Sequence, residues 1–201
     1  MIVAAVVLAA GQSRRMGSEN KLLAPLGGAP LVRRAVAAAR ASRARPVVVV
    51  TGHEADRVEA ALAGLDVRTV RNPDYALGLS ASLRAGLAAL DKDGVSGALI
   101  CLGDMPRVTA ATLDRLIDAF EAGGGRAICA PVADGRRGNP VLWPADLFAA
   151  MKELAGDAGA RELIARHADR LQTVDADAAE IFHDVDTPEA LAAARAAEDR
   201  L

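Results

Sequence analysis

The sequence has few aromatic residues and little net charge, and each shortage excludes a class of function. Aromatic residues make up only 2% of the chain, which leaves almost nothing on which nucleic-acid bases could stack. The formal net charge of -2 also argues against a general binder of polyanions. We therefore expect no nucleic acid among the partners of this protein.

Cysteines and long apolar runs are also scarce. Two cysteines, Cys101 and Cys129, are too few for a disulfide framework or a metal-ligand set, and we interpret them as small buried residues within strands. The apolar stretch Ile2 to Ala10 is too short to span a membrane, and no basic region precedes it. We therefore expect a cytoplasmic protein with no signal peptide and no membrane partner.

Apolar runs of strand length alternate with helical patterns along the 201 residues. This alternation is typical of βαβ units and a mostly parallel sheet, so we expect one α/β domain with a Rossmann-like, three-layer αβα arrangement. Residues 127–132 and 140–143 flank a turn-rich loop and predict a hairpin. The predicted strands are 2–8, 47–51, 67–70, 98–102, 127–132, 140–143, 171–174 and 181–185. The predicted helices are 31–41, 54–62, 80–90, 109–120 (capped by Thr109), 145–154, 160–167 and 188–199 (capped by Thr187).

Four polar or glycine-rich segments follow predicted strands. They are "LAAGQSRRMGSENKLL" (8–23), "RNPDYALGLSAS" (71–82), "GDMP" (103–106) and "FHDVDTP" (182–188). In open parallel sheets, ligands bind beyond the carboxyl ends of the strands. We therefore expect these segments to contribute to one site.

The first of these segments has the composition of a phosphate-binding loop but matches no familiar phosphate motif. It contains no G-x-G-x-x-G, and Ser18 and Glu19 follow Gly17 where a P-loop has lysine and a hydroxyl residue. Its glycines free backbone N–H groups, and its arginines and Lys21 supply charges that attract phosphate. A solvated turn with surface arginines is the alternative, but Lys21 and the position after the first strand favour an anion site.

Three aspartates are candidate metal ligands. Asp104 directly follows a buried apolar strand, and Asp184 and Asp186 lie at another predicted strand end. Mg²⁺ binds few protein carboxylates and shares its shell with substrate phosphates. Because Asp184 and Asp186 alternate along a predicted strand, we expect only one of them to face the metal and the other to be structural. For an isolated aspartate such as Asp104, a cap or a turn would be the simpler interpretation.

Four motifs together resemble the molybdenum cofactor nucleotidyltransferases of the MobA-like group. They are "LAAGQSRRMGSENKLL", "GDMP", "RRGNPVL" and "DVDTPEAL", in the order that the group shows. The resemblance covers residues 1–201 and implies a nucleotide-diphospho-sugar transferase type of fold, with a nucleotide-binding half (1–107) and a second-substrate half (108–201). Methylerythritol cytidylyltransferases share the start of the first motif but continue with a P-K-Q-like segment, so they resemble the chain less.

Within this group, the chain is most similar to the cytidylyltransferases. Guanylyl-transferring relatives usually read L-A-G-G and N-x-N-T-P, where this chain has "LAAG" (8–11) and "DVDTP" (184–188). The resemblance implies that Ala10 narrows the base pocket for a pyrimidine. Family members often carry histidine where this chain has Asn139, so only a polar contact is inferred for Asn139.

The resemblance implies transfer of CMP from CTP to the terminal phosphate of molybdopterin, with release of pyrophosphate and with Mg²⁺, or Mn²⁺, as cofactor. Lys21, Arg15 and Asp104 would be catalytic, and Asp104, Asp184 and Asp186 would bind the metal. The implied nucleotide-binding residues are Leu8, Ala9, Ala10, Gly11, Ser13, Arg14, Arg15, Lys21, Asn72, Ser80 and Gly103. The attacking phosphate oxygen is already anionic, so no general base is required.

The sequence signal for the residues that bind the second substrate is less specific. Gly138, Asn139, Pro140, Asp157 and Arg161 are the candidates, and a turn and a helix cap are equally good interpretations of these stretches. The same resemblance implies a molybdenum-insertion protein or a molybdoenzyme-specific chaperone as a partner. The alternatives are a guanylyltransferase that uses GTP, another sugar- or alcohol-phosphate nucleotidyltransferase, and a non-catalytic factor of molybdoenzyme maturation.

Overall fold

The computed structural model describes residues 1–13, 19–154 and 159–198. In this part of the chain an eight-stranded sheet has the order β10-β7-β9-β6-β1-β4-β5, with β8 beside β7. Its strands are β1 (Val3–Ala9), β4 (Val47–Thr51), β5 (Arg68–Arg71), β6 (Gly97–Leu102), β7 (Ile128–Ala133), β8 (Arg136–Arg137), β9 (Val141–Pro144) and β10 (Leu171–Asp175). A small second sheet pairs β2 (Pro25–Leu26) with β3 (Ala29–Pro30).

The main sheet is mostly parallel, as the sequence predicts. β1 pairs in parallel with β4 and β6, β4 with β5, and β10 with β7. The exception is β9, which runs antiparallel to both β6 and β7. The turn-rich loop before β9 contains β8, which pairs with β7, so the chain reverses direction there and the predicted hairpin is confirmed.

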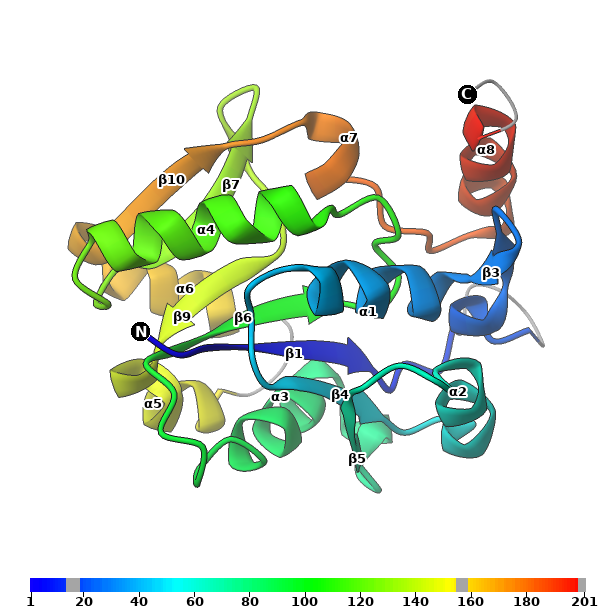
Figure 1. Cartoon of the computed structure of the whole chain (residues 1–201), viewed down its shortest axis with the longest axis horizontal. Helices are drawn as coiled ribbons and strands as arrows, with labels where there is room; N and C mark the ends of the chain where they lie inside the picture. The colour runs from blue at the N-terminus through cyan, green and yellow to red at the C-terminus, as the bar shows by residue number, and fades with distance from the viewer. Residues whose placement is uncertain (14–18, 155–158, 199–201) are drawn as a thin grey trace.

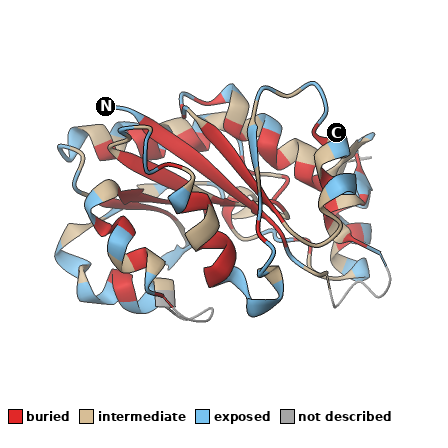
Figure 2. Ribbon diagram, turned by 90° about the horizontal axis from the view of Figure 1, so that it is seen from below, coloured by how far each residue is buried: buried red, intermediate tan, exposed pale blue. Residues whose placement is uncertain are grey.

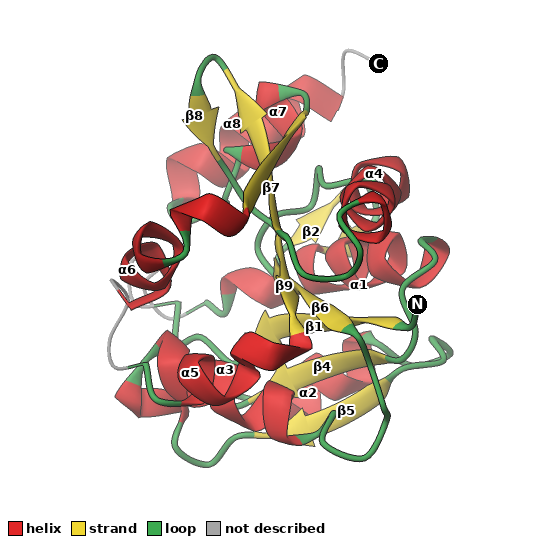
Figure 3. Cartoon of the chain, turned by 90° about the vertical axis from the view of Figure 1, so that its left-hand side faces the viewer, coloured by secondary structure: helices red, strands yellow, loops and turns green. Residues whose placement is uncertain are grey.

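Helices cover both faces of the sheet, and the predicted three-layer arrangement is confirmed. Figure 3 shows α1 and α4 on one side and α3, α5 and α6 on the other. The helices are α1 (Leu31–Ala41), α2 (Ala55–Ala61), α3 (Leu79–Ala88), α4 (Ala110–Ala122), α5 (Phe148–Lys152), α6 (Gly159–Arg166), α7 (Ala178–Ile181) and α8 (Pro188–Glu198). In the described residues, no helix has both the length and the apolar composition needed to cross a membrane.

The alternating side chains of β1 explain the two hydrophobic layers. Val3, Ala5 and Val7 pack with α1 and α4 on one face, whereas Ala4 and Val6 pack with α3 and α5 on the other. A strand that is covered on both faces reads as a continuous apolar run. Figure 2 shows these central strands as buried almost throughout.

Both cysteines are buried, as predicted. Burial raises the pKa of the Cys101 thiol to about 12 and that of Cys129 to about 11. Because the nucleophilic form of cysteine is the thiolate, neither residue supplies a nucleophile at neutral pH.

Two predicted helix starts are confirmed by their capping bonds. The Thr109 side chain accepts a hydrogen bond from Thr112 N at 3.2 Å and begins α4. Thr187 Oγ1 accepts from Ala190 N at 3.2 Å, and Pro188 is the first residue of α8. The predicted helix 145–154 is shorter, since a 3-10 turn (Ala145–Leu147) precedes α5.

The predicted strand 181–185 is wrong. Asp177 caps α7 by accepting a hydrogen bond from Ala179 N at 2.7 Å, and the helix extends to Ile181. The residues after it form no strand, and Val185 N donates to the main-chain oxygen of Asp104 at 3.0 Å. This backbone N–H is therefore satisfied by the loop after β6 instead of by a neighbouring strand.

Helix α8 lies beside the small sheet at the end toward which β1 points (Figure 1). Leu191 and Ala194 of α8 pack with Leu26 and Leu31. Arg34 forms an ion pair with Glu198, and Arg195 Nε donates to Pro25 O at 3.0 Å. This packing fixes α8, which directly follows Asp186 and Thr187, against the small sheet and the start of α1.

Candidate active site

A cavity of about 610 Å³ lies beyond the carboxyl ends of β1 and β6. It is lined by residues from all four polar segments that follow predicted strands, which therefore meet in space. Its lining residues are Leu8, Ala10, Gly11, Gln12, Ser13, Lys21, Leu22, Tyr75, Ala76, Gly78, Leu79, Ser82, Leu102, Asp104, Asp184 and Asp186. We call this space the first cavity.

Lys21 lies at the centre of the charged residues of the first cavity. Its Nζ donates to Asp104 Oδ2 at 2.5 Å and also forms an ion pair with Asp186. The backbone is fixed by Ser13, whose Oγ accepts from Lys21 N at 3.0 Å, and by Asn20, whose Oδ1 accepts from Leu22 N at 3.1 Å. These bonds hold Lys21 in a short 3-10 turn (Lys21–Leu23) that directs its ammonium to the carboxylates.

The charge state of Lys21 follows from this arrangement. Burial opposes the charged form, but Asp104 and Asp186, through their charges and hydrogen bonds, raise the pKa of Lys21 above its ordinary value. The lysine is therefore protonated throughout the neutral pH range. Lys21 therefore carries a permanent positive charge and does not act as a general base.

Asp104 has an oxygen that fits a cation. Its Oδ1 is buried and has no hydrogen-bond partner among the described residues, and its Oδ2 shares Lys21 with Asp186. The described residues contain no group of three or more histidine, cysteine or acidic side chains that could enclose a metal. Mg²⁺ and Mn²⁺ accept few protein carboxylates when substrate phosphates complete the shell, so these carboxylates fit such an ion.

Asp184 and Asp186 both line the first cavity. The prediction that only one of them faces the metal depended on a strand at 181–185. The structure has no strand there, because α7 extends to Ile181 and irregular backbone follows it. Asp186 forms an ion pair with Lys21, so it shares that ammonium with Asp104.

A second cavity, of about 500 Å³, adjoins the first and shares Leu8, Leu79 and Leu102 with it. Its polar lining residues are Ser80, Arg136, Arg137, Asn139 and Arg161, and Gly138 lines it through its backbone. Its apolar lining residues are Leu8, Leu79, Leu83, Ile100, Leu102, Ala130, Val141, Trp143, Met151, Leu154, Ala160 and Ile164. Three of the five expected second-substrate residues, Gly138, Asn139 and Arg161, thus lie in one cavity.

Some expected site residues line neither cavity. Ala9 and Gly103 are packed below the first cavity, where Gly103 N donates to Leu8 O at 3.0 Å. Pro140 is buried in the chain before β9. Arg14, Arg15 and Asp157 lie outside the described residues.

Asn72 does not line the first cavity but holds Ser82, which does. The Asn72 side chain is buried, and its Nδ2 donates to Ser82 Oγ at 3.1 Å. Its Oδ1 accepts from Asp74 N at 3.0 Å, which holds the following turn. Ser82 lines the first cavity, whereas the predicted Ser80 lines the second. Sequence reasoning missed Ser82, although its place two residues after Ser80 at the start of a helix was a signal.

Gly52 was also missed. A Cβ at this position would lie 2.6 Å from Tyr75 Cβ and 2.8 Å from Ala10 Cβ. Only glycine therefore allows these two lining residues to approach each other across the end of β4. A glycine directly after a predicted strand was the available signal.

The loop after β8, which lines the second cavity, contacts the end of α7. A Cβ on Gly138 would lie 2.6 Å from the main-chain oxygen of Ile181. Asn139 N donates to that oxygen at 3.3 Å, and the Arg136 guanidinium lies 4.8 Å from the centre of the Phe182 ring. The segment that carries Asp184 and Asp186 therefore rests on the loop that lines the second cavity.

Replacing Gly138 by alanine should displace that acidic segment. The added methyl group meets backbone and not the end of a flexible side chain, so the main chain must move. We expect a stability loss of about 1–3 kcal/mol and a fall in kcat of about tenfold to a hundredfold. Melting temperature and steady-state turnover measure the two effects.

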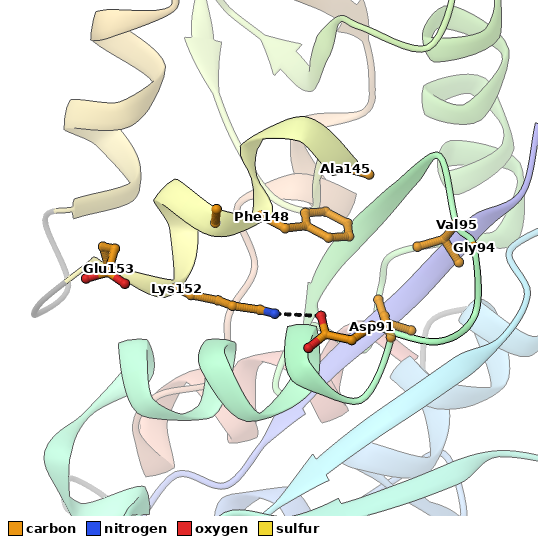
Figure 4. Close-up of a pocket in the computed structure, with 9 residues that line it drawn as sticks. Asp91, Gly94, Val95, Ala145, Phe148, Lys152 and Glu153 are labelled. Carbon is orange, nitrogen blue, oxygen red and sulfur yellow. Dashed lines mark hydrogen bonds and ion pairs between the residues drawn. The ribbon is translucent and has the colours of Figure 1, made fainter.

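Gly94→Ala is the matched control for Gly138→Ala. Gly94 has a φ of +61° and open space around it, and it lines a different cavity, shown in Figure 4. Alanine there costs stability through backbone strain and should leave turnover unchanged. Wild-type turnover in Gly138→Ala would show that the contact with Ile181 does not position the site.

The architecture of this chain is shared with solved nucleotidyltransferases. The chain has the nucleotide-diphospho-sugar transferase fold, which solved nucleotidyltransferases share. A nucleotidyl transferase from Methanothermobacter is 30% identical, with a TM-score of 0.86 and coverage of 99% of this chain and 98% of that one. The chain belongs to the MobA-like NTP transferase domain family, whose model matches residues 5–171.

Two further relatives match this chain over different shares of their own length. The bifunctional protein GlmU of Kineococcus radiotolerans is 44% identical over 123 residues, which are 60% of this chain but 25% of GlmU. The chain therefore spans about a quarter of that curated relative. The structure of Rv0371c from Mycobacterium tuberculosis in complex with manganese is 28% identical, with a TM-score of 0.79 and coverage of 98% and 99% of the two chains.

Proposed function

We propose that this protein transfers CMP from CTP to the terminal phosphate of molybdopterin or the molybdenum cofactor and releases pyrophosphate. The observation that carries the proposal is the pair of adjoining cavities, one with Lys21 between two carboxylates and the other apolar with arginines. Two cavities in contact suit a reaction that joins two substrates. In this proposal residues 1–107 supply most of the nucleotide site, with Asp184 and Asp186 added from the second half, and residues 108–201 supply the arginines and most of the lining of the acceptor site.

The first cavity is proposed to hold the nucleotide. Lys21 would move to the α-phosphate, and Gly11, Arg14 and Arg15 would hold the β- and γ-phosphates. Ala10 and Tyr75 form a narrow wall at the end of β4, since Gly52 brings them close together. This wall supports a pyrimidine base in preference to a purine, with the Ser82 hydroxyl as a hydrogen-bonding group that Asn72 holds in place.

Asp104 and Asp186, with Asp184 beside them, are proposed to hold Mg²⁺ or Mn²⁺. The unpartnered Oδ1 of Asp104 supports this role, and the manganese complex of the mycobacterial relative agrees with it. The bound ion would supply positive charge against the phosphates of the nucleotide. Asp104 is held for this task by the bond from Val185 N to its main-chain oxygen.

The second cavity is proposed to hold the acceptor. None of its lining residues in the described part of the chain is acidic, and three of them are arginines. Leu83, Trp143 and Ile164 provide apolar surface for a flat ring, while Arg136, Arg137 and Arg161 suit anionic groups. A sugar phosphate would find few partners for its hydroxyl groups there, which favours the pterin acceptor over the sugar phosphates of other nucleotidyltransferases.

The chemistry asked of the protein is alignment and charge neutralisation. The attacking phosphate oxygen carries a negative charge at neutral pH, so no residue needs to remove a proton. Lys21, protonated because of its acidic neighbours, would stabilise the negative charge that develops on the α-phosphate. The shared wall of the two cavities, Leu8, Leu79 and Leu102, would bring the acceptor phosphate to the α-phosphorus.

Pyrophosphate release with each of the four nucleoside triphosphates, molybdenum cofactor and Mg²⁺ tests the proposal. We expect release with CTP that requires the acceptor. Release with GTP instead would make the protein a guanylyltransferase, and release only with a sugar or alcohol phosphate would assign another acceptor. No release with any nucleotide would favour a non-catalytic role in molybdoenzyme maturation.

A further inference from the structure

Lys21 occupies the space between the carboxylates that the proposed function assigns to a metal. Its Nζ lies 2.5 Å from Asp104 Oδ2 and is also paired with Asp186. The Lys21 side chain is 12% exposed and that of Asp104 is 17% exposed, so the pair is largely shielded from water. The ammonium thus places a positive charge between two carboxylates in a site of reduced dielectric.

A divalent cation cannot bind these same oxygens while Lys21 remains there. Mg²⁺ needs its oxygen ligands at about 2.0–2.1 Å, and an ammonium within hydrogen-bonding distance of those oxygens overlaps the position of the ion. Two positive charges at such a separation also repel strongly. Asp104 Oδ1 alone would give the ion one protein ligand, so binding between the two carboxylates, through the oxygens that Lys21 now contacts, requires Lys21 to leave.

Lys21 needs another anion once it has left the carboxylates. A partly buried ammonium without a partner is costly, and a phosphate group in the first cavity is the partner that the proposed function supplies. The metal alone must then compete with Lys21, whereas the metal and the nucleotide together satisfy all the charges.

We propose that Lys21 is an internal cation that holds the metal site closed, and that it exchanges its place with the divalent cation when the nucleotide binds. The metal site is weak before the nucleotide arrives and strong afterwards. The exchange also delivers Lys21 from the carboxylates to the phosphates. This inference rests on the proposed role of Asp104 and Asp186 as metal ligands.

Titration with Mn²⁺ alone, without nucleotide or acceptor, tests the exchange. Lys21→Met removes the competing charge and keeps the length of the side chain, so it should bind Mn²⁺ at least about tenfold more tightly than the wild type. Calorimetry or the loss of the free Mn²⁺ signal in electron paramagnetic resonance measures the affinity. Added CTP should raise the Mn²⁺ affinity of the wild type much more than that of Lys21→Met.

Lys152→Met is the matched control. Figure 4 shows Lys152 directed at Asp91, to which its Nζ donates at 2.6 Å on the surface of a different cavity. This variant also removes a lysine from an ion pair with an aspartate. It should bind Mn²⁺ as the wild type does, whether CTP is present or not.

Equal or weaker Mn²⁺ binding by Lys21→Met, in a folded variant, would overturn the exchange. Because removal of Lys21 leaves two carboxylates close together, a second variant, Lys21→Gln, and the melting temperature guard against a folding defect. Mn²⁺ should raise the melting temperature of both variants more than that of the wild type. The titration needs no turnover, so its failure leaves the proposed reaction standing, and a failed pyrophosphate assay leaves the exchange standing.

Discussion

The Asp104→Asn variant should fold, and its turnover rate should be at least about 10²–10³-fold lower than that of the wild type. Asparagine keeps the size of the side chain but removes the negative charge that faces Lys21. It also replaces one of the carboxylate oxygens, and Oδ1 is buried without a partner among the described residues. A hard divalent cation binds a neutral amide oxygen less strongly than a carboxylate, so both metal binding and the position of Lys21 should suffer.

The stability of Asp104→Asn separates this effect from unfolding. The main-chain oxygen of Asp104, which accepts from Val185 N at 3.0 Å, is unaffected by the substitution. Asp91→Asn, which breaks the ion pair with Lys152 outside both cavities, is the control and should retain wild-type turnover. Pyrophosphate release at saturating CTP and Mg²⁺ is the measurement, and near-normal activity in Asp104→Asn would remove Asp104 from the reaction.

The Lys21→Ala variant should lose a similar amount of activity, and the loss should be mainly a fall in kcat of about 10²–10³-fold. A group whose interaction with the α-phosphate strengthens as the transition state forms lowers the barrier more than it tightens substrate binding. The CTP concentration for half-maximal rate should therefore change much less than the rate. Partial recovery in Lys21→Arg would show that the positive charge matters more than the shape of the ammonium.

Lys152→Ala provides the control for Lys21→Ala, because its ammonium also pairs with an aspartate. Its turnover should match that of the wild type. If Lys21→Ala raised the half-saturating CTP concentration with kcat unchanged, Lys21 would bind the ground state only, and the mechanistic role given to it here would be contradicted.

Much of the fold follows from local signals in the sequence. The apolar run of β1 predicts a strand that is covered on both faces, and the caps at Thr109 and Thr187 predict the starts of two helices. These features depend on neighbouring residues and not on the rest of the fold. The antiparallel course of β9 also follows from the turn-rich loop before it.

The segment after α7 was mispredicted because its apolar alternation imitates a strand. Ile181 and Val185 are buried, but one ends a helix capped by Asp177 and the other is tied to Asp104. The sheet already ends with β10 on that side. Which element takes the edge position of a sheet depends on the whole fold, so a local sequence pattern cannot predict it.

The candidate site was predictable as a set of segments and less so as a set of side chains. Lys21, Asp104 and Asp186 were expected at one site because their segments follow predicted strands, and the structure joins them although no strand directly precedes Asp186. Ser82, and not the predicted Ser80, lines the first cavity. Which of the two serines does so depends on how α3 is rotated against the sheet. The close approach at Gly52 depends on a loop far away in the sequence.

The fate of labelled phosphates tests the central claim most directly. CTP labelled at the α-phosphate should yield a labelled product of molybdenum cofactor, and CTP labelled at the γ-phosphate should yield labelled pyrophosphate only. Transfer of the γ-label to the acceptor, or release of the α-label as free CMP, would contradict nucleotidyl transfer.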